Sequence, residues 1–241
     1  MRVLATMALP LALTAACGND DRTLEVFAAS SLTDAFAAIE EAYEADHPDI
    51  DVRVVLAASS SLAAQVGDGA PADVLATADP ATMARAVASG EIDGTPMVFA
   101  RNRAVIAVDG DLGAGGSAAE ALDDARTLAV CAAEVPCGAA SERLFELLGV
   151  EPTPDTFEPN VRSVLTKLTL GEVDVGVVYA TDVLTVPDRL IVVPLAPDVE
   201  VATDYPIVTV DSDDADAAAF VDFIMSADGR EILDGFGFLR P

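Results

Sequence analysis

The chain has 241 residues and a formal net charge of −28, from 41 acidic and 13 basic side chains. Nucleic-acid binding needs clustered Lys and Arg to neutralise phosphates, so this balance excludes nucleic acid as a partner. It also argues against attraction to an anionic membrane surface. Hydrophobic residues make up 52% of the chain, which is enough to build a substantial core.

The first residues have the pattern of an export signal. Arg2 is followed by an apolar run that ends at Leu13, too short for a permanent span of about 20 residues. Small residues directly before Cys17 look like the cleavage site of a bacterial lipoprotein, whose cysteine carries the lipid. We therefore predict a lipoprotein signal peptide at 1–16, lipidation of Cys17, and a location on the outer face of the cell membrane or in the periplasm. An ordinary signal peptide with an incidental cysteine is the alternative.

From residue 24 onward the hydrophobic pattern alternates between strands and helices, which is typical of an α/β fold with a largely parallel sheet. Strands are predicted at 24–28, 50–56, 74–77, 98–99, 104–108, 128–131, 175–179, 190–193 and 207–210. Helices are predicted at 32–43, 62–67, 80–88, 139–148, 161–170, 214–225 and 229–233. No long linker interrupts the chain, which favours one domain or two interleaved lobes over two tandem domains.

Two strand-to-helix junctions share the same chemistry. Residues 26–32 read VFAASSL and residues 56–62 read LAASSSL, so each strand runs through small residues and serines into a helix. Hydroxyls and free N–H groups at a helix N-terminus can bind an oxyanion without any cation. The alternative is that these serines only cap their helices.

Motifs for catalysis and for metal binding are weak. There is no Gly-x-Ser-x-Gly, no P-loop and no Gly-x-Gly-x-x-Gly after a strand, and the cluster at 113–116 is interpreted as a loop. The single histidine, His47, lies between Asp46 and Pro48 in a predicted turn, where it is neither a catalytic base nor a zinc ligand. We expect no enzyme activity and no cofactor.

The other two cysteines are six residues apart. In a chain sent to an oxidising compartment, a disulfide between Cys131 and Cys137 is the expected outcome. Two buried thiols are the alternative.

With these features, the sequence resembles the periplasmic molybdate-binding proteins of bacterial ABC importers. The resemblance runs from about residue 24 to the C-terminus and rests on six blocks. They are VFAASSLTDAF (26–36), SSSLAAQ (59–65), GAPADVLATAD (69–79), VPCG (135–138), NVR (160–162) and GVVYATD (176–182).

The resemblance implies a class II periplasmic-binding-protein fold, with two α/β lobes, a hinge and a ligand cleft between the lobes. Lobe I would comprise 24–100 and 206–241, and lobe II would comprise 101–205. The chain would cross between them at 99–103 and return at 204–206. This arrangement would explain why no linker is visible.

The resemblance also implies a set of ligand-binding residues. The oxyanion would be held by Ser31 and Ser59 through hydroxyl and N–H groups, by Cys137 and Val161 through N–H groups, and by the Tyr179 phenol. Tyr179 could instead only end a buried strand, and Val161 could be a core residue of its helix. For Arg162 we favour a structural carboxylate as partner over the ligand. Molybdenum would then be bound only as its oxyanion, through these residues.

The predicted function is capture of molybdate, and of tungstate as well, for delivery to the transmembrane subunits of an ABC permease. Alternatives are a binding protein for sulfate or another tetrahedral oxyanion and, with less support, a serine hydrolase that uses one of the serines. We expect a monomer.

Overall fold

The computed structural model describes residues 22–110 and 116–241. The predicted signal peptide, Cys17 and most of the loop at 113–116 lie outside the described residues. The strands are β1 Arg22–Ala29, β2 Ile50–Ala57, β3 Val74–Ala76, β4 Met97–Asp109, β5 Leu128–Cys131, β6 Thr156–Glu158, β7 Val175–Tyr179, β8 Leu190–Val192 and β9 Ala202–Thr209.

Helices follow most of these strands. They are the 3-10 turn η1 Ser30–Leu32, then α1 Thr33–Asp46, α2 Ser59–Gly67, α3 Pro80–Val87, α4 Ala118–Asp123, α5 Pro136–Leu148, α6 Val161–Leu170, α7 Ala180–Leu184, α8 Ala215–Met225 and α9 Ala227–Gly235. No helix in the described parts of the chain is long and apolar enough to cross a membrane.

The strands form one extended sheet in the order β2-β1-β3-β9-β4-β7-β5-β6, with β8 added beside β4. Strands β1, β2 and β3 pair in parallel, and so do β5, β6 and β7. Strands β4 and β9 pair antiparallel with each other and with their other neighbours. The expectation of a largely parallel sheet is therefore wrong for the centre of the molecule, because the chain runs out along β4 and returns along β9.

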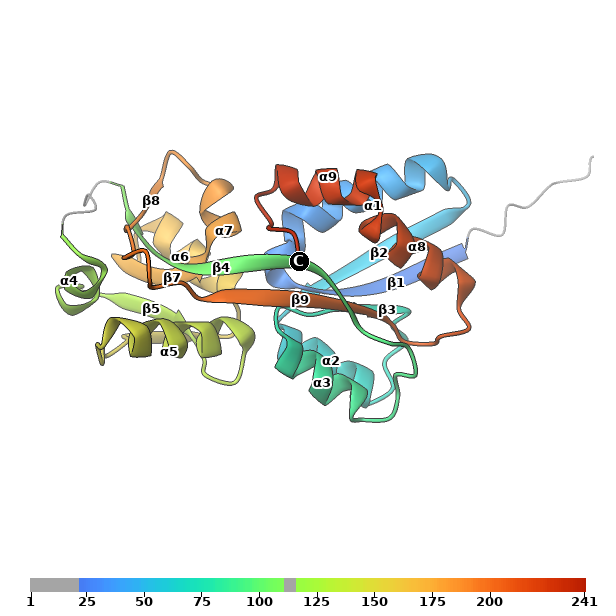
Figure 1. Cartoon of the computed structure of the whole chain (residues 1–241), viewed down its shortest axis with the longest axis horizontal. Coiled ribbons are helices and arrows are strands. Elements are labelled where there is room, and N and C mark those ends of the chain that lie inside the picture. Colours follow the sequence, from blue (N-terminus) through green and yellow to red (C-terminus); the bar gives the residue numbers. More distant parts are fainter. Residues whose placement is uncertain (1–21, 111–115) are drawn as a thin grey trace, which may run out of the picture.

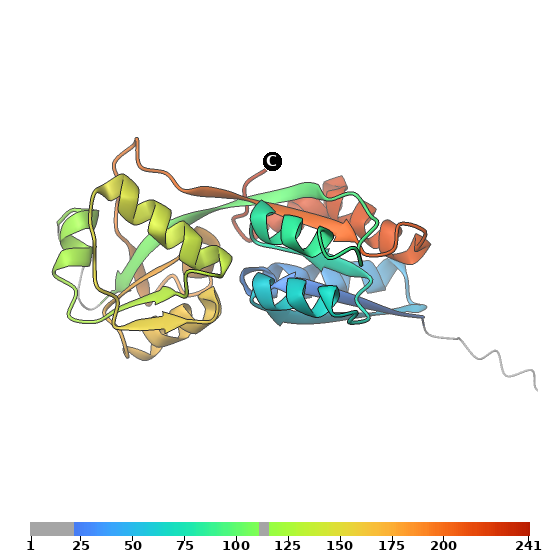
Figure 2. The ribbon, with the colours of Figure 1, turned by 90° about the horizontal axis from the view of Figure 1, so that it is seen from below.

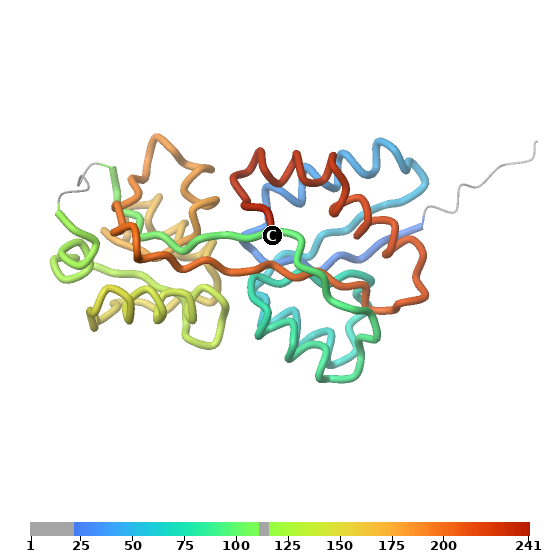
Figure 3. Tube along the Cα trace, in the orientation of Figure 1, coloured from blue at the N-terminus to red at the C-terminus, as the bar shows by residue number. Residues whose placement is uncertain are grey.

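Figures 1 and 2 show two groups of helices and strands joined by these two long strands. The tube in Figure 3 follows β4 and β9 side by side between the groups. Their pairing extends from Met97 opposite Ile207 to Arg103 opposite Ala202. Both predicted crossovers, at 99–103 and 204–206, lie within this paired stretch.

Each group has its own hydrophobic interior. One core is formed by residues between 104 and 201. Two further clusters are formed by residues 24–100 and 205–238. Tyr205, which the sequence interpretation placed in lobe II, packs in the core of the first group.

Periodicity located most elements and missed those with few apolar residues. Helices α4 and α7 and strand β6 were not predicted, and each has six residues or fewer. The strands predicted at 98–99 and 104–108 are one continuous strand, β4. Polar residues such as Asn102 interrupt its apolar pattern, yet Asn102 is buried.

Candidate functional site: an uncharged pocket between the two groups

All five ligand-binding residues inferred from the sequence line one small pocket. They are Ser31, Ser59, Cys137, Val161 and Tyr179. The lining is completed by Ala29, Ser30, Ala58, Ala78, Val135, Pro136 and Asn160. None of these side chains is charged, so any polar recognition in the pocket must come from neutral hydroxyl, amide and N–H groups.

Neither serine hydroxyl caps a helix. The positions preceding η1 and α2 are Ala29 and Ala58, and no side chain caps either element. Instead Ser59 Oγ accepts a hydrogen bond from the main-chain N–H of Ala78 at 3.0 Å, and Ser31 Oγ lies 2.9 Å from the Tyr205 hydroxyl. Capping is therefore the wrong interpretation of both junctions.

On the other side of the pocket, two helices begin. Helix α5 starts at Pro136, three residues earlier than periodicity predicted, which makes Cys137 the first residue of the helix with an N–H group. Helix α6 starts at Val161, and the side chain of Asn160 caps it by accepting from Ser163 N at 3.1 Å. The first N–H groups of a helix have no partner within the helix and lie at its positive end, so both can donate to an anion.

A disulfide closes the loop that leads into α5. Cys131, the last residue of β5, is bonded to Cys137 with 5.6 Å between their Cα atoms, so the predicted disulfide is confirmed. Gly138 packs against the same loop, and a Cβ there would lie 1.9 Å from the carbonyl oxygen of Ala132. The backbone around the Cys137 N–H is thus held by a covalent bond and by a close main-chain contact.

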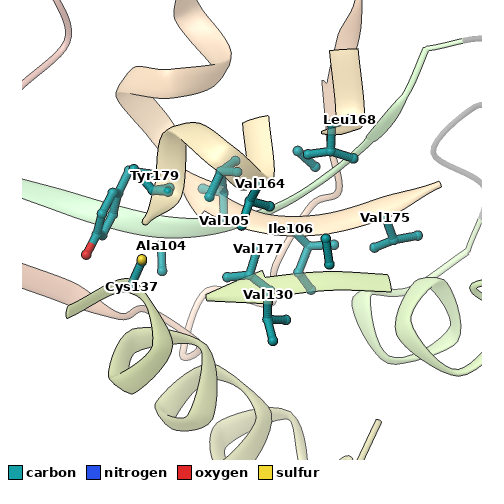
Figure 4. Close-up of a cluster of buried hydrophobic side chains, with 14 of the residues drawn as sticks. Ala104, Val105, Ile106, Val130, Cys137, Val164, Leu168, Val175, Val177 and Tyr179 are labelled. Carbon is teal, nitrogen blue, oxygen red and sulfur yellow. The ribbon is translucent and has the colours of Figure 1, made fainter. Parts of the chain in front are cut away.

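Tyr179 ends strand β7 and also borders the pocket, so the two interpretations of this residue are compatible. Figure 4 shows Tyr179 and Cys137 at one end of the core of the second group, with the phenol oxygen pointing away from the aliphatic side chains. Within the described residues that hydroxyl is buried without a hydrogen-bond partner. Burial raises the pKa of Tyr179 well above its usual value, so the phenol stays protonated and can donate.

Arg162 contacts carboxylates, as the favoured interpretation predicted. Its guanidinium binds Asp34 on α1, lies 3.3 Å from Asp182 Oδ1 on α7, and donates from Nε to the Ser30 carbonyl at 3.3 Å. Burial raises the pKa of Asp182 to about 7, and the positive charge of Arg162 acts in the opposite direction. Arg162 therefore joins the two groups of elements, and its charge is balanced by carboxylates.

Comparison with known proteins shows the family to which the chain belongs. The family model described as bacterial extracellular solute-binding protein matches residues 24–239. The molybdate-binding protein ModA of Mycobacterium tuberculosis is 37% identical over 223 residues, which cover 91% of this chain and 85% of that protein. The chain belongs to this family of extracellular solute-binding proteins, the ModA family. Its members are components of transport systems and not enzymes, as the sequence predicted.

Two further similarities refine the comparison. The putative ABC transporter substrate-binding lipoprotein YvgL of Bacillus subtilis is 30% identical over 225 residues, covering 90% of this chain and 86% of that protein. The solved periplasmic molybdate-binding protein of Azotobacter vinelandii superposes with a TM-score of 0.73 at 16% identity, over 90% of this chain and 99% of that one. At that identity the superposition shows the fold alone, and it confirms the predicted periplasmic-binding-protein fold.

The only histidine in the sequence is remote from the serines of this solute-binding protein. His47 follows the C-terminus of α1, where its ring stacks on Tyr43 and its Nδ1 lies 3.0 Å from the Tyr43 carbonyl oxygen. Ser31 precedes the N-terminus of the same 14-residue helix, a distance of roughly 20 Å along the axis. No imidazole base is therefore available to activate Ser31 as a nucleophile.

Larger hollows lie elsewhere on the surface of this solute-binding protein. One of them is bordered by Glu142, Glu146 and Glu151, whose charges oppose binding of an anion. Within residues 22–110 and 116–241, no group of three or more His, Cys, Asp or Glu side chains is arranged to hold a metal ion. The uncharged pocket is thus the best candidate for the solute site on chemical grounds.

Sequence analysis did not identify two residues that support the pocket without lining it, Tyr205 beside Ser31 and Asn102 beside Tyr205. Tyr205 and Asn102 lie on the crossing strands, and both are buried. They belong to stretches that were interpreted only as crossovers, so no motif pointed to them.

Proposed function

We propose that this chain is the substrate-binding protein of an ABC importer, that it captures molybdate in the uncharged pocket, and that it delivers the ion to the transmembrane subunits of the permease. The observation that carries the proposal is the convergence of five residues from five separate segments on one pocket. Tungstate, which has the same shape and charge, is proposed as a second ligand.

The chemistry of the pocket suits such an ion. A fully deprotonated tetrahedral oxyanion offers only hydrogen-bond acceptors, and the pocket is bordered by two serine hydroxyls, a phenol and two helix N-termini. These neutral dipoles can bind an anion although the whole chain carries a net charge of −28, because exposed charges are screened beyond about 8 Å at physiological salt. Sulfate has the same hydrogen-bonding pattern, so it stays the alternative, and we propose that cavity size selects between the ions.

We further propose that lobe I and lobe II, with the boundaries inferred from the sequence, close on the ligand about the paired segment of β4 and β9. Separate hydrophobic cores on either side of that segment support the proposal, because each lobe can then move as a packed unit. The Arg162–Asp34 pair supports it as well, since it connects the lobes directly beside the pocket.

The finer location is also a proposal. Membership of an extracellular family and the resemblance to a lipoprotein relative support export and lipidation at Cys17. A Cys17→Ser variant expressed in the native host should move from the membrane fraction to the soluble extracytoplasmic fraction. Retention of that variant at the membrane would show that the anchor is not attached to Cys17.

The molybdate proposal is tested by thermal unfolding with molybdate, tungstate, sulfate or phosphate. A ligand present at 100 times its dissociation constant stabilises the native state by about 2.7 kcal/mol, so molybdate and tungstate should raise the melting temperature. A shift with sulfate alone would replace molybdate by the alternative ligand. No shift with either molybdate or tungstate would contradict the proposal.

Two serine variants test whether the ligand binds beside Ser59. Ser59→Ala removes the buried hydroxyl that borders the pocket, whereas Ser61→Ala removes an exposed hydroxyl on the same helix. A hydrogen bond to a charged group contributes about 1.5–3 kcal/mol, so Ser59→Ala should weaken molybdate binding about 10- to 100-fold. Ser61→Ala should leave the dissociation constant unchanged, and equal effects of the two substitutions would place the ligand elsewhere.

A further inference from the structure

We propose that Tyr205 is a positioning residue that makes the Ser31 hydroxyl a hydrogen-bond donor to the bound oxyanion. The proposal deepens the proposed function and rests on it. Tyr205 does not line the pocket; it lies behind Ser31 on β9, and its hydroxyl is 2.9 Å from Ser31 Oγ. A hydroxyl pair of this kind can be oriented in either direction, so its surroundings must determine which oxygen donates.

The orientation of the two hydroxyls depends first on the side chain of Asn102 on β4. The main-chain N–H of Arg103 can only donate, and it lies 2.9 Å from Asn102 Oδ1, which identifies that atom as the amide oxygen. The other end of the side chain is therefore the NH2 group. It donates to Thr181 Oγ1 at 2.8 Å and to the Tyr205 hydroxyl oxygen at 3.5 Å.

The next two hydrogen bonds connect Asn102 to Tyr205 and Tyr205 to Ser31. The Asn102 NH2 group can only donate, so the oxygen of Tyr205 accepts on that side. The proposal directs the hydrogen of Tyr205 to Ser31 Oγ, which lies 2.9 Å away. Ser31 Oγ then accepts from Tyr205, and the single hydrogen of the Ser31 hydroxyl is left for the pocket. The main-chain N–H of Arg103 fixes the direction of the bonds that Asn102 makes, and the direction of the bond between Tyr205 and Ser31 is what the proposal adds.

The Ser59 hydroxyl also accepts a hydrogen bond, and here the donor is a main-chain N–H group. Ser59 Oγ accepts directly from the main-chain N–H of Ala78, so its hydrogen is also available to the pocket. Both serines would thus act only as donors toward the ligand. These two hydrogens suit a fully deprotonated oxyanion, whose oxygens can only accept hydrogen bonds.

The ring of Tyr205 is held in place independently of its hydroxyl. It makes edge-to-face contacts with Phe99, Phe238 and Tyr179, with ring centroids 6.4, 5.6 and 6.0 Å away, and the residue is fully buried. Tyr205→Phe therefore removes the oxygen and retains the packing, so its effect on binding can be separated from an effect on the fold.

The test is a double-mutant cycle read by isothermal titration calorimetry with molybdate. Tyr205→Phe should raise the dissociation constant about five- to tenfold, the range expected for a lost buried hydrogen bond. In a Ser31→Ala background the same substitution should change it less than about twofold, because Tyr205 acts through Ser31. A substitution that only loosened the structure would weaken binding equally in both backgrounds.

Tyr43→Phe is the matched control. Tyr43 is buried like Tyr205, but its hydroxyl has no hydrogen-bond partner in the described part of the chain and the residue does not border the pocket, so loss of that hydroxyl should leave binding unchanged. Asn102→Asp gives a second route if Tyr205→Phe unfolds, because a carboxylate would accept the Tyr205 hydrogen in place of Ser31. The cycle with Ser31→Ala subtracts the effect of the added charge.

The outcomes separate the two proposals. Wild-type protein that binds neither molybdate nor tungstate overturns the proposed function and this inference with it. Wild-type protein that binds, combined with an unchanged or equally weakened Tyr205→Phe variant in both backgrounds, overturns the role of Tyr205 and leaves the function standing. Coupling between Tyr205 and Ser31 supports the inference.

Discussion

The two sides of the pocket are built by different means. On the lobe I side, the polar groups include the hydroxyls of Ser31 and Ser59. Ser59 Oγ accepts from the Ala78 N–H, and Ser31 Oγ shares a hydrogen bond with the Tyr205 hydroxyl. On the lobe II side, the polar groups include main-chain N–H groups at the starts of α5 and α6, together with the Tyr179 phenol. Binding should therefore depend on side-chain identity in lobe I and mainly on backbone shape in lobe II.

This difference changes where a substitution is informative. Replacing Cys137 or Val161 by another residue leaves its N–H group in place, so such a change tests only the support of the backbone. The support in lobe II consists of the disulfide, the close contact at Gly138 and the Asn160 cap. Opening the disulfide or substituting Gly138 deletes no group that is proposed to bind the ligand, whereas the Asn160 side chain also lines the pocket.

The largest effect is expected at Gly138. In Gly138→Ala the new Cβ would lie 1.9 Å from the Ala132 carbonyl oxygen and 2.6 Å from its carbon, so the backbone has to move. We expect a loss of about 3 kcal/mol in the free energy of unfolding and no measurable molybdate binding, by chemical denaturation and calorimetry. Gly235→Ala is the control, since a Cβ there meets nothing within 4 Å, and its stability and affinity should be unchanged. Wild-type affinity in Gly138→Ala would show that this backbone does not shape the pocket.

A smaller effect is expected when the disulfide is opened. Cys131 and Cys137 are six residues apart, and a loop of this length predicts a loss of about 2 kcal/mol in the free energy of unfolding on reduction. Because the bridge holds the Cys137 N–H beside the pocket, molybdate affinity should fall as well, by about three- to tenfold. Titration with and without reductant measures the change, with a Cys131→Ala, Cys137→Ala double variant as the reagent-free comparison. Unchanged affinity in the reduced protein and in the double variant would limit the bridge to a role in stability.

The sequence predicted local features of the fold and site better than their three-dimensional support. Strong periodicity located the principal helices, and the serines of the two junctions lie on one side of the candidate pocket. The start of α5 was placed at 139, since Pro136, Cys137 and Gly138 carry no helical pattern, although Pro is favoured in the first helical turn. The hydrogen-bond partners of the two serines could not be predicted. The partner of Ser59 is the main-chain N–H of Ala78, which no side chain marks in the sequence, and the partner of Ser31 is Tyr205, which lies 174 residues away in the chain.

The smallest effect on molybdate affinity is expected at the cap of α6. A matched cap on another helix separates this effect from a loss of stability. Asn160→Ala removes the side chain that accepts from Ser163 N, and Ser226→Ala removes the equivalent cap of α9, which accepts from Gly229 N at 3.3 Å. Loss of a cap costs about 1 kcal/mol in either helix, so both variants should unfold at similarly lowered denaturant concentrations. Only Asn160→Ala acts at the pocket, where it frees the helix start that presents the Val161 N–H and removes a lining side chain, so it alone should weaken molybdate binding, by about two- to threefold. Equal affinities of the two variants would mean that the N–H groups of lobe II contribute little and that the hydroxyls of lobe I dominate recognition.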